Sequence, residues 1–320
     1  MTRIAARWTG FLARFWRTDT ALTAVSLGML PVLVGSLLGV LLDPRTVLGV
    51  PVWVKPAKFA ASIAVYGLTL LWAFSHLPAG SRARRSVGRI SAGVFVLEML
   101  IISVQAARGT TSHFNASTPL DGALFTIMGV GILTQTVASV FAALALYRQK
   151  FADRVLGWAL RLGLTLTIVG ASFGGLMTQP TDAQLLEMRA GHPEAVGAHT
   201  VGAPDGGPGL AVTGWSKEHG DLRAPHFLGL HAFQALPLLA LGLRRSRLPQ
   251  SQRVALIWVA GASYAALMAI LLGQALAGQP LLEPHTTVAA ALLAWAVTSL
   301  ALTVWVLERR SAAGAPLPAA

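Results

Sequence analysis

The sequence predicts an all-α fold: a polytopic membrane bundle of eight transmembrane helices in two tandem four-helix halves, with both termini cytoplasmic. First, 54% of the 320 residues are apolar and only 12% are charged, whereas a soluble domain carries about a quarter charged residues. Second, apolar runs of about 20 residues, enough to cross a bilayer, recur along the chain. Third, basic residues collect in alternate connections. Together these observations exclude a soluble enzyme, a disordered chain and a fibrous protein.

The chain is predicted to begin with an amphipathic interfacial helix over residues 1–20, lying on an anionic inner leaflet. On a helical wheel, apolar side chains share one face and arginines occupy the other. The apolar face holds Ile4, Trp8, Phe11, Leu12, Phe15 and Trp16, and the basic face holds Arg3, Arg7, Arg14 and Arg17. The segment lacks the small-residue cleavage pattern of a signal peptide. Residues 311–320 are predicted to form a disordered tail.

Eight apolar stretches are long enough to span a bilayer as helices. They cover residues 21–42, 58–76, 90–107, 123–147, 155–177, 226–243, 254–272 and 286–307. Lysine and arginine are enriched in cytoplasmic loops, and with the N-terminus inside, 17 of the 25 basic residues lie on the cytoplasmic side. We therefore expect a multi-pass protein of a bacterial plasma membrane. Its partner is the lipid bilayer and not a nucleic acid, despite the net charge of +12.

Short motifs recur in both halves of the chain, which predicts an internal duplication. The pattern Val-Gly-x-x-x-Gly-x-Leu occurs at 34–41 and again at 169–176, and Gln-Ala-x-x-Gly occurs at 105–109 and again at 274–278. The predicted halves are residues 21–150 and 151–310. Tandem halves of equal orientation are related by an axis along the membrane normal, so a binding site is expected between them.

One long extracytoplasmic loop, residues 178–225, interrupts the second half. Thr181 and Gln184 have the spacing of a capping box, and Gly191 is suited to end a short helix there. The charged and aromatic residues that follow favour an ordered lid. The glycine-rich part is not followed by Gly-Lys-Ser/Thr, so a nucleotide site is not expected.

An acidic residue, Glu98, lies near the middle of the third predicted span. It forms a polar stripe with Ser91 and Gln105, at seven-residue spacing. A carboxylate at that depth must be protonated, paired with a cation or in contact with water. Lys58 and His231 are the expected partners. Glu98 is then either a proton relay or substrate contact, or one half of a structural ion pair.

Seven of the eight histidines are expected on the extracytoplasmic side. His231 shares a helix face with Gln234, well inside the sixth span, whereas His226 starts that span. His113 and His285 each precede the last span of their half. Without cysteine, neutral imidazole is the expected ligand for haem iron or a divalent metal. The candidate ligands are His231, His285, His113 and His226.

Several motifs resemble those of uncharacterised bacterial multi-pass membrane proteins, a resemblance that implies no activity. They are Lys-Pro-Ala-Lys-Phe at 55–59, Ala-Arg-Gly-Thr-Thr-Ser-His-Phe-Asn at 107–115, the segment 199–209 and Asp-Leu-Arg-Ala-Pro-His-Phe at 221–227.

The architecture also resembles that of haem A synthase. That family has eight spans in two halves and holds haem with histidines near the outer ends of even-numbered spans. His226 or His231 in the sixth span, and His285 before the eighth, fall in comparable places. The second span departs from the family, because Lys58 stands where a histidine is expected.

These observations leave three functional hypotheses. The first is a haem- or metal-binding membrane protein with a histidine-lined site near the extracytoplasmic face. The second is a small-molecule transporter or binder with a polar site between the halves. Its candidate ligand-binding or proton-relay residues are Glu98, Lys58, Gln105, Gln234 and Gln274. The third, a zinc-dependent lipid hydrolase, ranks last because His-Glu-x-x-His is absent.

Overall fold

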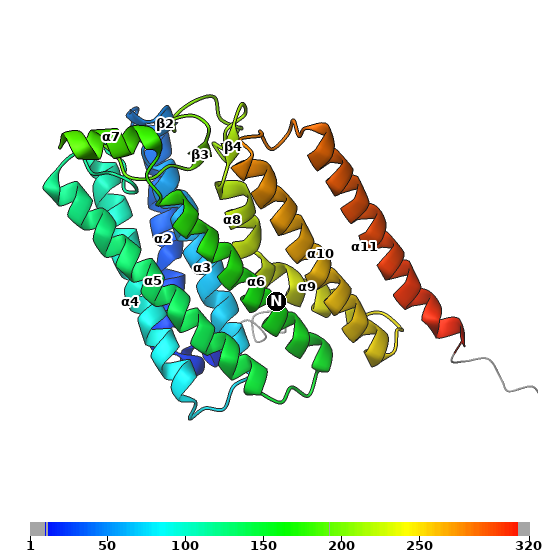
Figure 1. The fold of residues 1–320 in the computed structure, drawn as a ribbon. Helices are drawn as coiled ribbons and strands as arrows, with labels where there is room; N and C mark the ends of the chain where they lie inside the picture. Colours follow the sequence, from blue (N-terminus) through cyan, green and yellow to red (C-terminus); the bar gives the residue numbers. More distant parts are fainter. Residues whose placement is uncertain (1–9, 11, 192, 313–320) are drawn as a thin grey trace, which may run out of the picture.

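The computed structural model describes residues 10, 12–191 and 193–312, and the molecule is a bundle of long, nearly parallel helices (Figure 1). Seven helices are long and apolar enough to cross a membrane, and a bent helix pair raises the number to as many as eight. The predicted all-α polytopic bundle is confirmed. Which end of the bundle is cytoplasmic stays a prediction.

The first half contains α2 (Thr20–Leu42), α3 (Val54–Phe74), α4 (Arg82–Arg108) and α5 (Pro119–Arg148). The second half contains α6 (Arg154–Met177), α8 (Arg223–Leu230), α9 (Ala232–Leu243), α10 (Gln250–Leu276) and α11 (Thr286–Ala312). Two short hairpins, β1 (Thr46–Val47) with β2 (Val50–Pro51) and β3 (Thr200–Val201) with β4 (Gly220–Asp221), lie in loops. Of the predicted interfacial segment, residues 12–18 are helical, while residues 1–9 and 11, like 313–320 of the predicted tail, lie outside the described residues.

Four of the long helices, α2, α4, α5 and α6, begin where a short polar side chain accepts a hydrogen bond from a backbone N–H of the first turn. These N-cap residues are Asp19, Ser81, Thr118 and Asp153. Such caps satisfy donors that would otherwise stay unpaired at the membrane surface.

The two halves pack in the same order. In each, the first helix contacts the second and the third, and the third contacts the fourth. The helix α5 packs on α6 and joins the halves, whereas α11 packs on α10 at the edge of the bundle (Figure 1). The duplication itself stays a prediction, and this shared pattern fits it.

The sixth predicted span is not one helix. The chain bends by 44° between α8 and α9, and His231 stands at the break. Thr167 of α6 repairs the interrupted hydrogen-bond ladder, because its hydroxyl lies 3.1 Å from the carbonyl oxygen of Gly229 and 3.2 Å from the amide nitrogen of Phe233. Tyr264 donates to the carbonyl of Leu228, which also accepts from the backbone N–H of His231. Such repair is what permits a broken helix within lipid.

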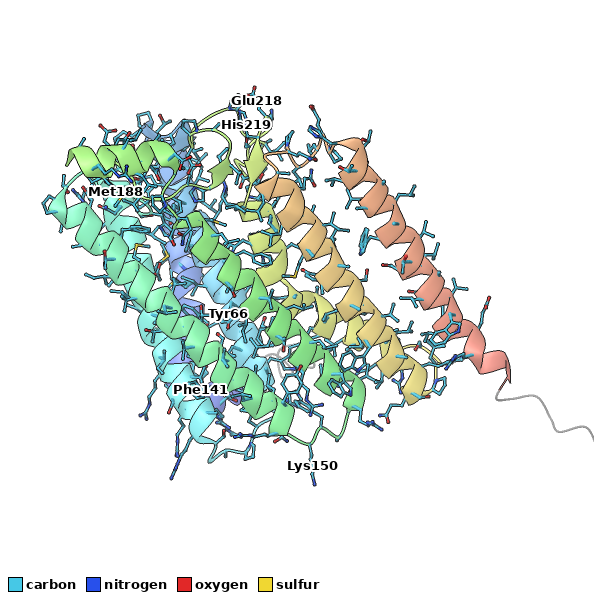
Figure 2. All side chains as sticks on the ribbon, in the orientation of Figure 1. Tyr66, Phe141, Lys150, Met188, Glu218 and His219 are labelled. Atoms are coloured by element: carbon cyan, nitrogen blue, oxygen red, sulfur yellow. The ribbon has the colours of Figure 1, made fainter. Side chains whose placement is uncertain are left out.

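The loop between α6 and α8 is ordered. We call residues 178–222 the lid, and the end of the bundle that it covers the lid end. The predicted capping box is present at the start of α7 (Asp182–Ala190), and Gly191 ends this helix with a φ of 83°. Figure 2 shows Glu218 and His219 at the lid end and Lys150 at the opposite end.

Two side chains bind the lid to the bundle. The Lys58 ammonium, on α3, donates to the carbonyl of Thr213 at 2.8 Å. The Arg223 guanidinium, on α8, donates to the neighbouring carbonyl of Gly214 at 2.7 Å. The lid is therefore held by both halves.

Candidate functional site

Glu98 is buried in α4 without a partner. Only 2% of its surface is exposed, and neither carboxylate oxygen has a hydrogen-bond partner among the described residues. Gly131 of α5 lies beside it, since a Cβ at that glycine would make ordinary van der Waals contact with Oε1, at 3.5 Å. Burying an ionised carboxylate without compensation is strongly unfavourable. The group is therefore neutral at rest or compensated by something other than these side chains.

Two more buried polar atoms without a described partner lie on these two helices. Ser91 of α4, two turns from Glu98, is fully buried and its hydroxyl has no described partner. Gln135 of α5, one turn after Gly131, is 8% exposed and its Oε1 has none either. Native proteins leave few buried polar atoms unpaired, so these three residues, which we call the polar cluster, stand out from the rest of the spans.

Tyr66 continues the polar cluster across the bundle. Its hydroxyl lies 3.1 Å from the Ser139 hydroxyl, and the Gln135 amide donates to that same hydroxyl at 3.2 Å. The Tyr66 ring contacts Phe95 of α4 and Phe233 of α9. Figure 2 shows Tyr66 near the middle of the bundle, where α3, α4, α5 and α9 meet.

Lys55 is the cation that acts on Glu98. It occupies the first turn of α3, is partly buried, and has no hydrogen bond or ion pair among the described residues. Its charge attracts the Glu98 carboxylate without touching it. The expected partners are not there: Lys58 is exposed and binds the lid, and His231 lies 3.3 Å from Gln234.

Gln105 and Gln274 hold helix ends in equivalent ways. The Gln105 amide donates to the carbonyl of Thr111 at 3.3 Å, and Gln274 donates to that of Pro280 at 2.7 Å. In each case the bonded carbonyl lies six residues later, just beyond a glycine in the left-handed region: Gly109 and Gly278. The repeated Gln-Ala-x-x-Gly motif is thus a helix-ending motif.

Gln105 has a second task that Gln274 lacks. It donates to the Asp121 carboxylate at 2.7 Å, and Arg108 bridges Gln105 and Asp121. Asp121 is only 3% exposed. Gln105 is therefore engaged in a buried polar network at the lid end of the first half.

The four candidate ligand histidines are not gathered at one point. His226 donates through Nδ1 to the carbonyl of Gly170 at 2.7 Å, because a carbonyl can only accept. His231 packs on Phe227 and His285 is exposed. His113 lies 3.1 Å from the Ser112 hydroxyl.

A histidine–aspartate pair in the lid was not predicted. His199 lies 2.6 Å from the Asp205 carboxylate, which also accepts from the backbone N–H of His199 and Thr200. Burial lowers the pKa of His199, against the opposing effect of Asp205. The hydrogen bonds hold the pKa of Asp205 well below its usual range, although burial opposes this. The two residues are six apart in the sequence, and the Pro-Asp-Gly turn at 204–206 was the only sequence signal.

Phe114 separates this pair from His113. Its ring centroid lies 4.8 Å from that of His199 and 6.2 Å from that of His113. Burial lowers the pKa of His113 well below its usual value, and the charge of Lys55 adds to the effect. Burial therefore disfavours the protonated form of both imidazoles.

The arrangement gives no support to a metal or haem site. Within the described part of the chain, no three histidine, cysteine, aspartate or glutamate side chains are placed to hold a metal ion. One cavity lies between α10 and α11 and another beside residues 116–119, and no described residue that lines either is a histidine. A haem or metal site therefore stays a prediction.

Comparison with protein-family models, with curated proteins and with solved structures finds no match to this chain. The resemblance to haem A synthase therefore stays a prediction, and the function must be argued from the site.

Proposed function

We propose that the protein is a proton-linked transporter of a small organic anion, with Glu98 as the proton-binding group. The observation that carries the proposal is the complete burial of this carboxyl group without a hydrogen-bond partner. Intramembrane ionisable groups usually mark ion or substrate pathways. A structural ion pair would bring Glu98 into contact with a cation, and Lys55 attracts it only from a distance.

Lys55 supplies the link between anion and proton. It is a cation with no bound partner among the described residues, so an anion entering from the lid end can pair with it. That anion replaces Glu98 as the counter-charge of Lys55. A buried carboxylate that loses its only nearby cation takes up a proton. One anion and one proton are thus bound together.

The broken helix supports a transport role. Discontinuous helices line the substrate sites of many transporters. Here the break between α8 and α9 faces α3, because Gln234 donates to Thr69 across the halves at 3.3 Å. Tyr66 contacts Phe233 just beyond the break, so the polar cluster and the broken helix adjoin.

The test is uptake into liposomes that contain the purified protein. Acetate, lactate and succinate are supplied separately, with and without an inward proton gradient. We expect at least one anion to accumulate when the gradient is present. Glu98→Gln should abolish this accumulation, and Lys55→Met should abolish anion binding, which is read from thermal stabilisation.

Glu283→Gln is the matched control, because Glu283 is an exposed carboxylate in the loop before α11. It should transport like the wild type. Gradient-driven uptake that survives in Glu98→Gln would remove Glu98 from the mechanism. If none of the three anions stabilises or crosses with the wild-type protein, the anion assignment is wrong.

A further inference from the structure

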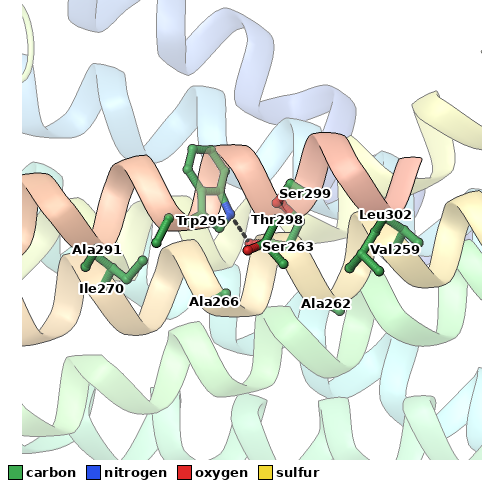
Figure 3. Close-up of a pocket in the computed structure, with 11 residues that line it drawn as sticks. Val259, Ala262, Ser263, Ala266, Ile270, Ala291, Trp295, Thr298, Ser299 and Leu302 are labelled. Atoms are coloured by element: carbon green, nitrogen blue, oxygen red, sulfur yellow. Dashed lines mark hydrogen bonds between the residues drawn. The ribbon is translucent and has the colours of Figure 1, made fainter. Parts of the chain in front are cut away.

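A cavity of about 400 Å³ lies between α10 and α11, at the edge of the bundle and away from Glu98 (Figure 3). Small side chains line most of it, among them Ala262, Ala266 and Ala291. They leave the two helices apart where larger residues would fill the space. Such a hollow in the membrane-spanning part of a lipid-facing helix pair is open to the bilayer.

Three of the four polar side chains that line this cavity, all but Thr298, have a described hydrogen-bond partner. The Trp295 indole N–H donates to the carbonyl of Ser263 at 2.8 Å, as Figure 3 shows. The Ser263 and Ser299 hydroxyls lie 2.7 Å apart. With these groups paired, the cavity offers an occupant mainly apolar surface and dispersion contacts.

Positive charge lies at one end of the groove. The Gln252 amide donates to the carbonyl of Val306 at 3.0 Å, which aligns the start of α10 with the end of α11. Arg253, the next residue along α10, has a buried Nε without a described partner. The Arg309 guanidinium lies over the Trp305 ring, 3.7 Å from its centroid.

The spacing matches a phospholipid. Six residues separate Arg253 from Val259, the first lining residue of α10, which is about 9 Å along a helix. A phospholipid whose headgroup lies beside the arginines can therefore place an acyl chain in the cavity. Arginine pairs readily with phosphate.

We propose that the groove between α10 and α11 binds one phospholipid with an anionic headgroup. The phosphate lies against Arg253 and Arg309, and one acyl chain fills the cavity. The lipid then stabilises the contact of α11, which packs on little but α10 among the described helices. This site is independent of the transport proposal.

The experiment uses the full chain in vesicles of phosphatidylcholine with an equal share of phosphatidylglycerol, followed by native mass spectrometry. The wild type should retain one phosphatidylglycerol, at least tenfold enriched over phosphatidylcholine. Ala266→Phe fills the cavity and should lose the bound lipid. Arg253→Gln should keep a lipid but lose the headgroup preference.

Ala296→Phe is the matched control, because Ala296 is exposed on α11 and does not line the cavity. It should retain the lipid like the wild type. Equal retention by Ala266→Phe and Ala296→Phe overturns the site. A wild-type dimer that Ala266→Phe dissociates overturns it too, because a second copy of the chain would then be the occupant.

Discussion

The two halves share one packing pattern but differ in what they bury. The first half places Ser91 and Glu98 inside, facing α5. The offset of 169 that relates Gln105 to Gln274 puts Ala260 and Leu267 at the corresponding places of α10. At these two places the same helix arrangement thus holds buried polar residues in one half and half-buried apolar residues in the other. The arrangement determines where a site is possible, and a few side chains determine whether it exists.

The largest expected difference concerns the glycine motif that both halves share. A Cβ on Gly170 would stand 2.5 Å from the backbone of Gly229, whereas one on Gly35 meets nothing within 4 Å. Gly170→Ala should lower the free energy of unfolding by about 3 kcal/mol, since backbone cannot move aside cheaply. Gly35→Ala should be neutral. Unfolding in mixed SDS micelles measures both, and equal effects would contradict the asymmetry.

The next comparison replaces Glu98 of α4 by leucine, and Leu267, at the corresponding place of α10, by glutamate. Glu98→Leu should raise the free energy of unfolding by about 2 kcal/mol, because it removes an unpaired buried polar group. Leu267→Glu should lower it by about 2 kcal/mol or more. Both are read from the same unfolding assay. Destabilisation by Glu98→Leu would instead indicate a structural ion pair.

The helix-ending glutamines allow a finer comparison. Gln105→Ala should lower the free energy of unfolding by about 2 kcal/mol, since it removes a hydrogen bond to the Asp121 carboxylate. Gln274→Ala should lower it by about 1 kcal/mol, because only backbone carbonyls lose a donor. If the two variants unfold alike, Asp121 contributes nothing through Gln105.

The smallest expected effect is a pH response of the lid. His199 faces Asp205, Arg223 and Lys55, and burial lowers its pKa. As the pH falls below about 6.5, the usual value for histidine, an open lid takes up a proton more readily than the closed one. Acid should therefore loosen residues 199–209 a few-fold. Hydrogen-exchange protection factors, corrected for intrinsic rates, measure this, and His199→Gln should flatten the response.

The spans were predictable because the sequence of each one is enough to determine that it forms a helix. Apolar runs of bilayer length must form helices whatever surrounds them. The capping box at Thr181 was predictable for the same reason. The break at His231 was not, because Thr167 and Tyr264, which repair it, belong to other helices.

The candidate site shows a similar division. Glu98 stands out in the sequence as an acidic residue in an apolar run. Its cation, Lys55, was not distinguished from Lys58, since the two lie one turn apart and only the position of the lid decides between them. Nothing in the sequence distinguishes Gln135 and Ser139 from other polar residues of a span. Their importance comes from Tyr66, on another helix.

The lid has a mechanical consequence. It is fastened to the first half through Lys58 and to the second through Arg223, and the backbone of Val196 also bonds that of Phe114. The two halves are thus joined to each other through the lid at one end of the bundle. Relative rotation of the halves about these contacts therefore displaces the end of the bundle opposite the lid most.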